Sequence, residues 1–138
     1  MKNKLLDKIE QLGGMNSTHD ILVSIDDFFE GNTIEYSFAA NACDTDFNVN
    51  EFYNIFKKIK DFDTVQDIWI MITDVDEEWP YSDTAFIALN NIIQESDINE
   101  WLGKGYPSEI REVNLKDEPS IPIPYLKDGY KLLSLWWD

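Results

Sequence analysis

Cys43 and His19 are the single cysteine and the single histidine of this chain. Nucleophilic catalysis needs a nucleophile together with a base that accepts its proton. Cys43 stands just before Asp44 and Asp46, and negative neighbours raise the pKa of a thiol instead of activating it. His19 lies beside Asp20 in a polar stretch where we expect it to be solvated. We therefore predict no catalytic residue.

Metal ligation is the next chemistry to consider. Acidic and amide side chains alternate over residues 44–50, like the start of an EF-hand calcium loop. That loop needs glycine at its sixth position and glutamate at its twelfth, where this chain has Val49 and Ile55. One His and one Cys are too few for an ordinary zinc site. The acids of residues 74–83 could hold a weak cation, but we expect a solvated loop there. The sequence predicts no metal and no cofactor.

Negative charge is the strongest signal in the composition. The chain carries 27 acids and 11 bases, a net charge of -16. Residues 9–56 and 61–103 contain no Lys or Arg and hold 20 of the 27 acids, so we expect these carboxylates to lack a local cation. Such a surface repels the phosphates of nucleic acids and of lipids and speeds association with basic proteins. The same composition is also expected where acidity only maintains solubility.

Aromatic side chains occur within the most acidic stretch. Tryptophan and tyrosine are enriched in binding hot spots, and carboxylates around them complement Lys or Arg on a partner. The alternative for Trp79 is that it folds back on the core. The predicted partner-binding residues are those of the acidic loop and of an earlier acidic segment: Asp74, Asp76, Glu77, Glu78, Trp79, Tyr81, Asp83, Asp26, Asp27 and Glu30.

Helical spacing of apolar residues and capping residues define four expected helices. They cover residues 5–12, a short segment after Ser24 that ends at Gly31, residues 49–60 with Asn48 or Asn50 as cap, and residues 97–102 after Ser96 or Asp97.

Alternating or continuous apolar runs define four expected strands. These are residues 33–39, 66–73, 84–90 and 130–137, with residues 105–128 expected to be irregular. About ten residues join the second and third strands, which is too short for a helical crossover, so they should be antiparallel. Alternation in the last strand should bury one of Trp136 and Trp137. The chain is thus expected to be a single α+β domain over residues 1–138, with a mainly antiparallel sheet of about four strands and helices packed on one face.

Several short stretches, in collinear order, resemble a family of small uncharacterised bacterial proteins. They are residues 23–32 (VSIDDFFEGN), 66–68, 78–83 (EWPYSD), 100–102 and 136–138 (WWD). This resemblance implies no catalytic residue. In size, charge and fold class the chain is also similar, more loosely, to the immunity proteins that bacteria make against their own toxins. That second similarity implies a protein that binds and neutralises a basic toxin domain, often a nuclease.

Two functional hypotheses follow from these observations. The first is a cytoplasmic binding protein, in its specific form an immunity protein, with a basic protein partner such as a toxin domain and no affinity for nucleic acid or membrane. No window approaches 18 consecutive apolar residues, and no signal peptide precedes the first helix. The alternative is a self-associating adaptor or structural protein without enzymatic activity, which pairs an exposed edge strand near the C-terminus.

Overall fold

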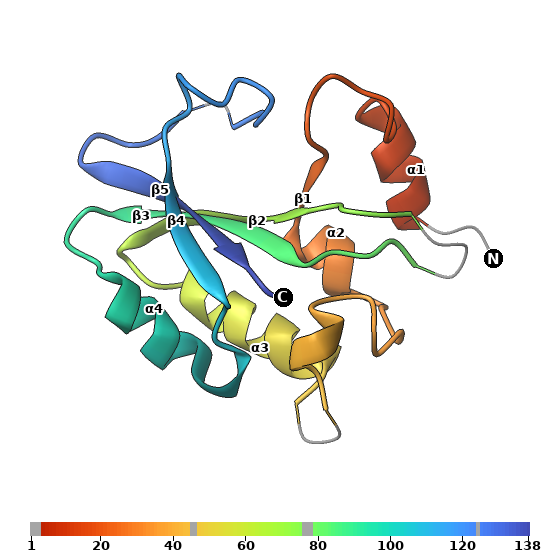
Figure 1. Ribbon diagram of the computed structural model, residues 1–138, viewed down its shortest axis with the longest axis horizontal. Helices are drawn as coiled ribbons and strands as arrows, with labels where there is room; N and C mark the ends of the chain where they lie inside the picture. Colours follow the sequence, from red (N-terminus) through yellow and green to blue (C-terminus); the bar gives the residue numbers. More distant parts are fainter. Residues whose placement is uncertain (1–3, 45–46, 76–78, 124) are drawn as a thin grey trace.

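The computed structural model describes residues 4–44, 47–75, 79–123 and 125–138 (Figure 1). Its helices are α1 (Lys4–Gln11), α2 (Ile25–Phe29), α3 (Val49–Lys60) and α4 (Glu95–Leu102), with short 3-10 turns η1 (Ala40–Ala42) and η2 (Gly103–Gly105). Its strands are β1 (Leu22–Ser24), β2 (Val65–Met71), β3 (Thr84–Asn90), β4 (Glu109–Val113) and β5 (Tyr130–Trp136).

The five strands form one antiparallel sheet in the order β1-β2-β3-β5-β4. This confirms the predicted α+β class and the predicted antiparallel pairing of β2 with β3. The last strand in sequence, β5, lies between β3 and β4. One edge of the sheet is therefore β4, and the other is β1. β4 falls inside the stretch that we expected to be irregular, which is a correction to that expectation.

One face of the sheet carries the main core. In Figure 1, α2, α3 and α4 lie on this side, and α1 packs beside α2 at the β1 edge. Phe52 and Phe56 of α3 surround the ring of Trp137, which is 2% exposed, while Leu5 and Ile9 of α1 belong to the same cluster. The helices on one face and the burial of one terminal tryptophan are therefore confirmed.

In the described part of the chain, no helix residue belongs to the core on the opposite face. Residues 114–123 and 125–129 cross it, and Ile121 and Ile123 pack against Phe86, Ala88 and Leu132 to form a second, smaller core. The residues of this face lie in rows that run across the strands. In the order β2, β3, β5 and β4, one row consists of Trp69, Phe86, Ser134 and Arg111. The next row consists of Met71, Thr84, Trp136 and Glu109, and it lies at the end of the sheet where the loop connects β2 to β3.

The predicted strand over residues 33–39 is wrong. The segment forms a turn in which Asn32 accepts a hydrogen bond from the Ile34 N–H at 3.0 Å and donates to the Ser37 hydroxyl at 2.7 Å. Ser37 N–H also bonds back to the Ile34 carbonyl at 3.1 Å, which satisfies the backbone locally. Asn and Ser side chains compete in this way with sheet pairing. Tyr36 is 68% exposed and Phe38 is fully buried, so the expected common face does not exist.

The helix ends agree with the predicted caps at two of three positions. The Ser24 hydroxyl accepts from Asp27 N–H at the start of α2, and the Asn48 side chain accepts from Asn50 N–H at the start of α3. α4 begins earlier than expected, with Gln94 as its cap in place of Ser96 or Asp97. Among the described residues, no helix is both long and apolar enough to cross a membrane.

Candidate interaction surface

The acidic loop of residues 74–83 is closed at its base by backbone pairing. Tyr81 N–H donates to the Asp74 carbonyl at 2.9 Å, and Thr73 N–H donates to the Tyr81 carbonyl at 2.9 Å. Asp74 itself is exposed. The predicted contact residues Asp76, Glu77 and Glu78 lie outside the residues that the structure describes.

Trp79 links this loop to α2. Its indole Nε1–H donates to the Phe28 carbonyl at 3.0 Å, and its ring packs half-buried against the main core. Trp79 thus folds back on the core, which is the alternative that the sequence left open. The bond brings the loop and the earlier acidic segment side by side (Figure 1), although 51 positions separate the two residues.

The side of α2 that faces solvent carries Asp26, Asp27 and Glu30, all exposed. The Tyr53 hydroxyl donates to the Asp26 carboxylate at 2.7 Å, and burial, the hydrogen bond and the charges of Asp26 and Glu30 raise the pKa of Tyr53 to about 12. Lys57 Nζ lies 4.2 Å from the centre of the Tyr53 ring. One cation therefore stands next to this acidic group. We refer to Asp26, Asp27, Glu30 and Asp74, with Trp79 between the two segments, as the α2–loop surface.

Tyr81 and Asp83 are half-buried and hold the loop in place. The Asp83 carboxylate accepts from the Thr84 hydroxyl at 2.8 Å, and its backbone carbonyl accepts from Trp137 N–H at 3.0 Å. Burial is the main cause that raises the pKa of Tyr81, and the charges of Asp83 and Cys43 add to it. The predicted contact set thus divides into exposed acids and residues that support the loop.

Cys43 and His19 do not form a pair. The Cys43 thiol donates a hydrogen bond to the Phe38 carbonyl at 3.3 Å. His19 is exposed, and its backbone N–H donates to the Ser17 hydroxyl. Burial, with the charges of Asp44 and Glu35, raises the pKa of Cys43 to about 11. A thiol with this pKa is protonated at neutral pH, so its nucleophilic form is scarce. In the described part of the chain, no cluster of three or more His, Cys, Asp or Glu could hold a metal ion.

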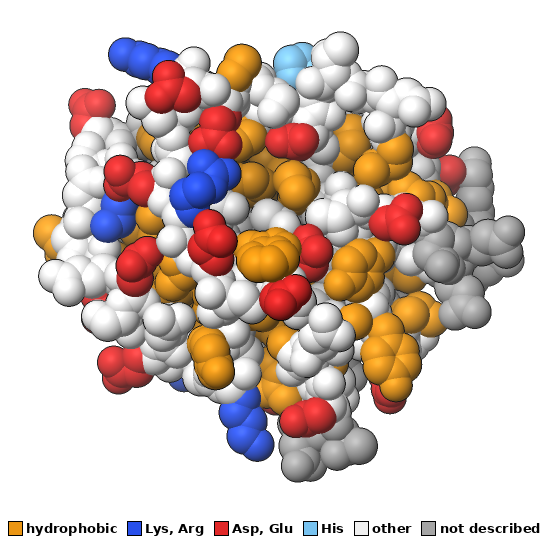
Figure 2. Space-filling view, in the orientation of Figure 1, with side chains coloured by type: hydrophobic (Ala, Val, Ile, Leu, Met, Phe, Trp, Pro, Cys, Tyr) orange, Lys and Arg blue, Asp and Glu red, His pale blue; other side chains and the backbone are white. Residues whose placement is uncertain are grey.

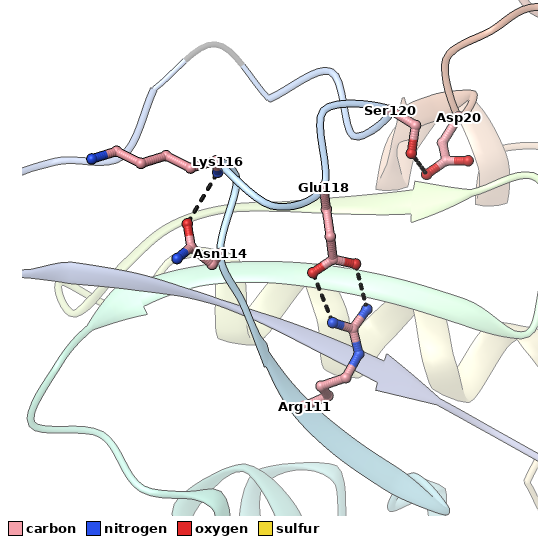
Figure 3. A network of polar contacts seen from close by, with 6 residues as sticks. All are labelled: Asp20, Arg111, Asn114, Lys116, Glu118 and Ser120. Carbon is pink, nitrogen blue, oxygen red and sulfur yellow. Dashed lines mark hydrogen bonds and ion pairs between the residues drawn. The ribbon is translucent and has the colours of Figure 1, made fainter.

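The expectation that acids in the two base-free windows lack a local cation is wrong for Asp67. Lys60, just before the second window, lies 3.7 Å from the Asp67 carboxylate. The second ion pair joins Arg111 to Glu118 through two bonds of 2.8 and 3.0 Å (Figure 3). This bond is the main cause that lowers the pKa of Glu118. Both pairs lie away from the exposed acids of α2.

A groove of about 340 Å³ lies on the sheet face opposite the helices. Its floor is the end row of the sheet, where Met71, Thr84 and Trp136 lie side by side. The Arg111–Glu118 pair and the Ser120 hydroxyl bonded to Asp20 at 3.4 Å hold the covering segment at the border of this row (Figure 3). Sequence reasoning missed the groove because its lining comes from every strand except β1 and from two connecting segments. The groove is lined by Asp20, Met71, Thr84, Phe86, Glu109, Arg111, Glu118, Ile121, Ser134 and Trp136.

The model of the uncharacterized protein YfbO family matches residues 1–135. The chain belongs to this family. The resemblance to a family of small uncharacterised proteins is thereby confirmed, while the similarity to immunity proteins stays a hypothesis. No curated protein and no solved structure matches the chain.

In this YfbO family member, the described residues bring carboxylates and tryptophan together at two places. The α2–loop surface presents exposed carboxylates around a half-buried tryptophan, and the groove presents an exposed tryptophan with carboxylates at its border. Figure 2 shows the second pattern: near the end of β5, exposed hydrophobic side chains are flanked by Asp and Glu side chains.

Proposed function

We propose that this protein binds a basic protein partner through the α2–loop surface. The observation that carries the proposal is the bond from Trp79 to the Phe28 carbonyl. This bond ties Trp79, in the described part of the acidic loop, to the end of α2. A partner that contacts Asp74 at the base of the loop and the acids of α2 would bind both segments at once. A partner with Lys or Arg side chains gains association rate from such a cluster.

The charges near this surface support the proposal. Asp26 and Asp27 lie in the first turn of α2, a helix of five residues whose last turn has no basic residue, and Glu30 caps the C-terminal end of this helix. Within the described chain no ion pair involves these three acids; Lys57, above the Tyr53 ring, is the neighbouring cation. Carboxylates without an ion-pair partner remain available to the basic side chains of another protein.

The specific form of the proposal is a cytoplasmic immunity protein. Its partner would be a toxin domain with a basic surface, of the kind that nucleases use to bind phosphates. A net charge of -16 also opposes binding to nucleic acid and to anionic membranes. An open reading frame for such a toxin beside the gene for this chain would identify the partner to test.

The experiment compares wild type with a variant in which the α2 acids are neutral. The tagged protein captures partners from its native host, and the affinity for a captured protein is then measured from low to high salt. We expect the affinity to fall with ionic strength and to fall in the variant Asp26→Asn, Asp27→Asn, Glu30→Gln. The matched control variant neutralises three exposed acids elsewhere: Glu100→Gln, Glu112→Gln and Asp117→Asn. The proposal would be overturned if both variants lost the same amount of affinity for the captured protein, or if the affinity of wild type did not change with salt concentration.

Self-association is the second candidate, because β4 leaves one side of the sheet unpaired. Three exposed charged residues on this strand, Glu109, Arg111 and Glu112, oppose edge-to-edge pairing. Light scattering separates the two functions, since the binding proposal needs no oligomer of this chain. The second candidate would be favoured if light scattering shows a stable dimer and the substitution Glu112→Lys on β4 changes the dissociation constant of that dimer.

A further inference from the structure

The groove at the end of the outer sheet face is the feature that the proposed function does not use. Its floor consists of Met71 and Trp136 on either side of Thr84, on three neighbouring strands. Trp136 is 38% exposed, whereas the next aromatic row inward is covered, with Phe86 only 3% exposed. The covering segment thus leaves one end row open to solvent.

Charge identifies the kind of side chain that fits. Three carboxylates, Asp20, Glu109 and Glu118, line the groove together with one guanidinium, Arg111, so three negative charges less one positive leave a net of -2. Arg111 is bonded to Glu118 through both of its terminal nitrogens. Glu109, at the start of β4, is exposed and pairs across the sheet with Trp136.

A cation beside an aromatic ring and a carboxylate is stabilised by both. The two lysines that lie over aromatic rings in the described chain contact Tyr53 and Tyr130, so they do not occupy the Trp136 ring. We propose that the groove receives a lysine or arginine side chain of the basic partner, held between the Trp136 ring and the carboxylates of Glu109 and Asp20. This inference rests on the proposed function and adds a second contact to the α2–loop surface.

The location of the groove supports a shared partner. Met71 and Thr84, which pair at the floor, are the last residue of β2 and the first residue of β3. The acidic loop connects these two strands, so the groove and the loop occupy the same end of the sheet. One basic protein can therefore contact the loop and place a side chain in the groove. The volume of about 340 Å³ is within the range of pockets that bind small molecules, so it is large enough for one lysine or arginine side chain.

The experiment uses hexa-arginine as the probe and NMR of the whole protein as the readout. The indole N–H resonances of Trp136 and Trp79 report on the groove and on the α2–loop surface separately, and Trp→Phe variants assign them. We expect the Trp136 resonance to shift and to saturate with hexa-arginine, and hexa-glutamate to leave it unchanged. Trp136→Leu lacks this indole, so the backbone amide resonances of Glu109 and Arg111, which line the groove, report binding in that variant. The dissociation constant that they give should be about fivefold higher than in wild type, the size expected for one cation–π contact.

Glu109→Gln gives a second test that leaves the floor of the groove intact. It should weaken binding at Trp136 about threefold, as expected for one carboxylate near a partly exposed cation. Glu112→Gln is the matched control, because it removes the same charge from the same exposed strand outside the groove. Equal effects of the two substitutions would overturn the inference, because they would reflect net charge alone.

The two resonances also separate this inference from the proposed function. Shifts at Trp79 without shifts at Trp136 would overturn the groove and leave the α2–loop proposal standing. Shifts at Trp136 alone would overturn the α2–loop proposal, and shifts at neither would overturn both. A shift of the Trp136 resonance that depends on protein concentration in the absence of probe would overturn the inference, because it would show that a second copy of this chain fills the groove instead.

Discussion

The indole of Trp79 joins the described part of the acidic loop to α2. Its N–H satisfies the carbonyl of Phe28, which is near the end of α2. A buried acceptor that loses its donor costs about 1–3 kcal/mol. The same ring fills space against the main core, so the substitution that isolates the hydrogen bond must keep an aromatic ring.

Trp79→Phe should therefore lower the free energy of unfolding by about 1–2 kcal/mol. Urea unfolding at neutral pH measures the change. Trp136→Phe is the control, because Trp136 is 38% exposed, and it should change the free energy by less than about 0.5 kcal/mol. If both substitutions cost the same, the bond to Phe28 does not hold the loop on α2.

The raised pKa of Cys43 has a consequence for reactivity. A pKa of about 11, compared with an ordinary thiol value of 9.0, leaves about one hundredth of the thiolate at a given pH below both values. The native protein should thus react with an aromatic disulfide reagent at pH 7.5 roughly one hundred times more slowly than the chain unfolded in urea. A native rate close to the unfolded rate would revive Cys43 as a nucleophile.

At the scale of elements, strongly periodic segments could be predicted and weakly periodic ones could not. Residues 49–60 and 84–90 have apolar side chains at helical and strand spacing, and α3 and β3 form there. β4 reads Glu-Ile-Arg-Glu-Val, whose charges suit an edge strand and hide its apolar pattern. The segment 33–39 shows the reverse error, since its alternation is real but Asn32 and Ser37 bond the backbone into a turn.

The covering segment, residues 114–123 and 125–129, depends on polar contacts as much as on its apolar residues. The bidentate pair of Arg111 with Glu118 connects it to β4, and Gln66 of β2 bonds to the Tyr125 carbonyl and the Lys127 N–H. Partly exposed pairs contribute little to global stability, about 0.5–1 kcal/mol. Their loss should instead be visible as local opening.

Glu118→Gln should speed hydrogen exchange in residues 114–123 and lower the free energy of unfolding by about 0.5–1 kcal/mol at pH 7. The pKa of Glu118 is lowered in the folded state, so its stabilisation is present above the unfolded pKa and is lost as pH falls through the folded pKa. The cost of the substitution should therefore shrink when unfolding is measured at pH 3. A cost that is the same at both pH values would exclude the ion pair as its cause.

At the scale of the molecule, the sequence identified the acidic segments but not their neighbours. Asp26 and Asp74 were predicted as parts of separate candidates, and only the fold brings their segments together through Trp79. The groove was invisible because its residues, from Asp20 to Trp136, span most of the chain. Net charge alone could not distinguish carboxylates that stabilise the fold, such as Glu118, from those that remain free of ion pairs.

Glu30 should be a carboxylate that lowers stability. It caps the C-terminal end of α2, where the helix dipole disfavours negative charge, and it lies four residues after Asp26 on the same helix face. Glu30→Gln should raise the free energy of unfolding by about 0.3–0.5 kcal/mol in 20 mM salt, and this gain should disappear in 0.5 M salt. Urea unfolding at the two salt concentrations measures both effects, with Glu118→Gln as a control of opposite sign. The same Glu30→Gln protein should bind the basic partner more weakly, because the charge that opposes folding is the one that attracts the partner.

A loss of stability on this substitution would instead assign Glu30 a structural role and remove it from the proposed surface.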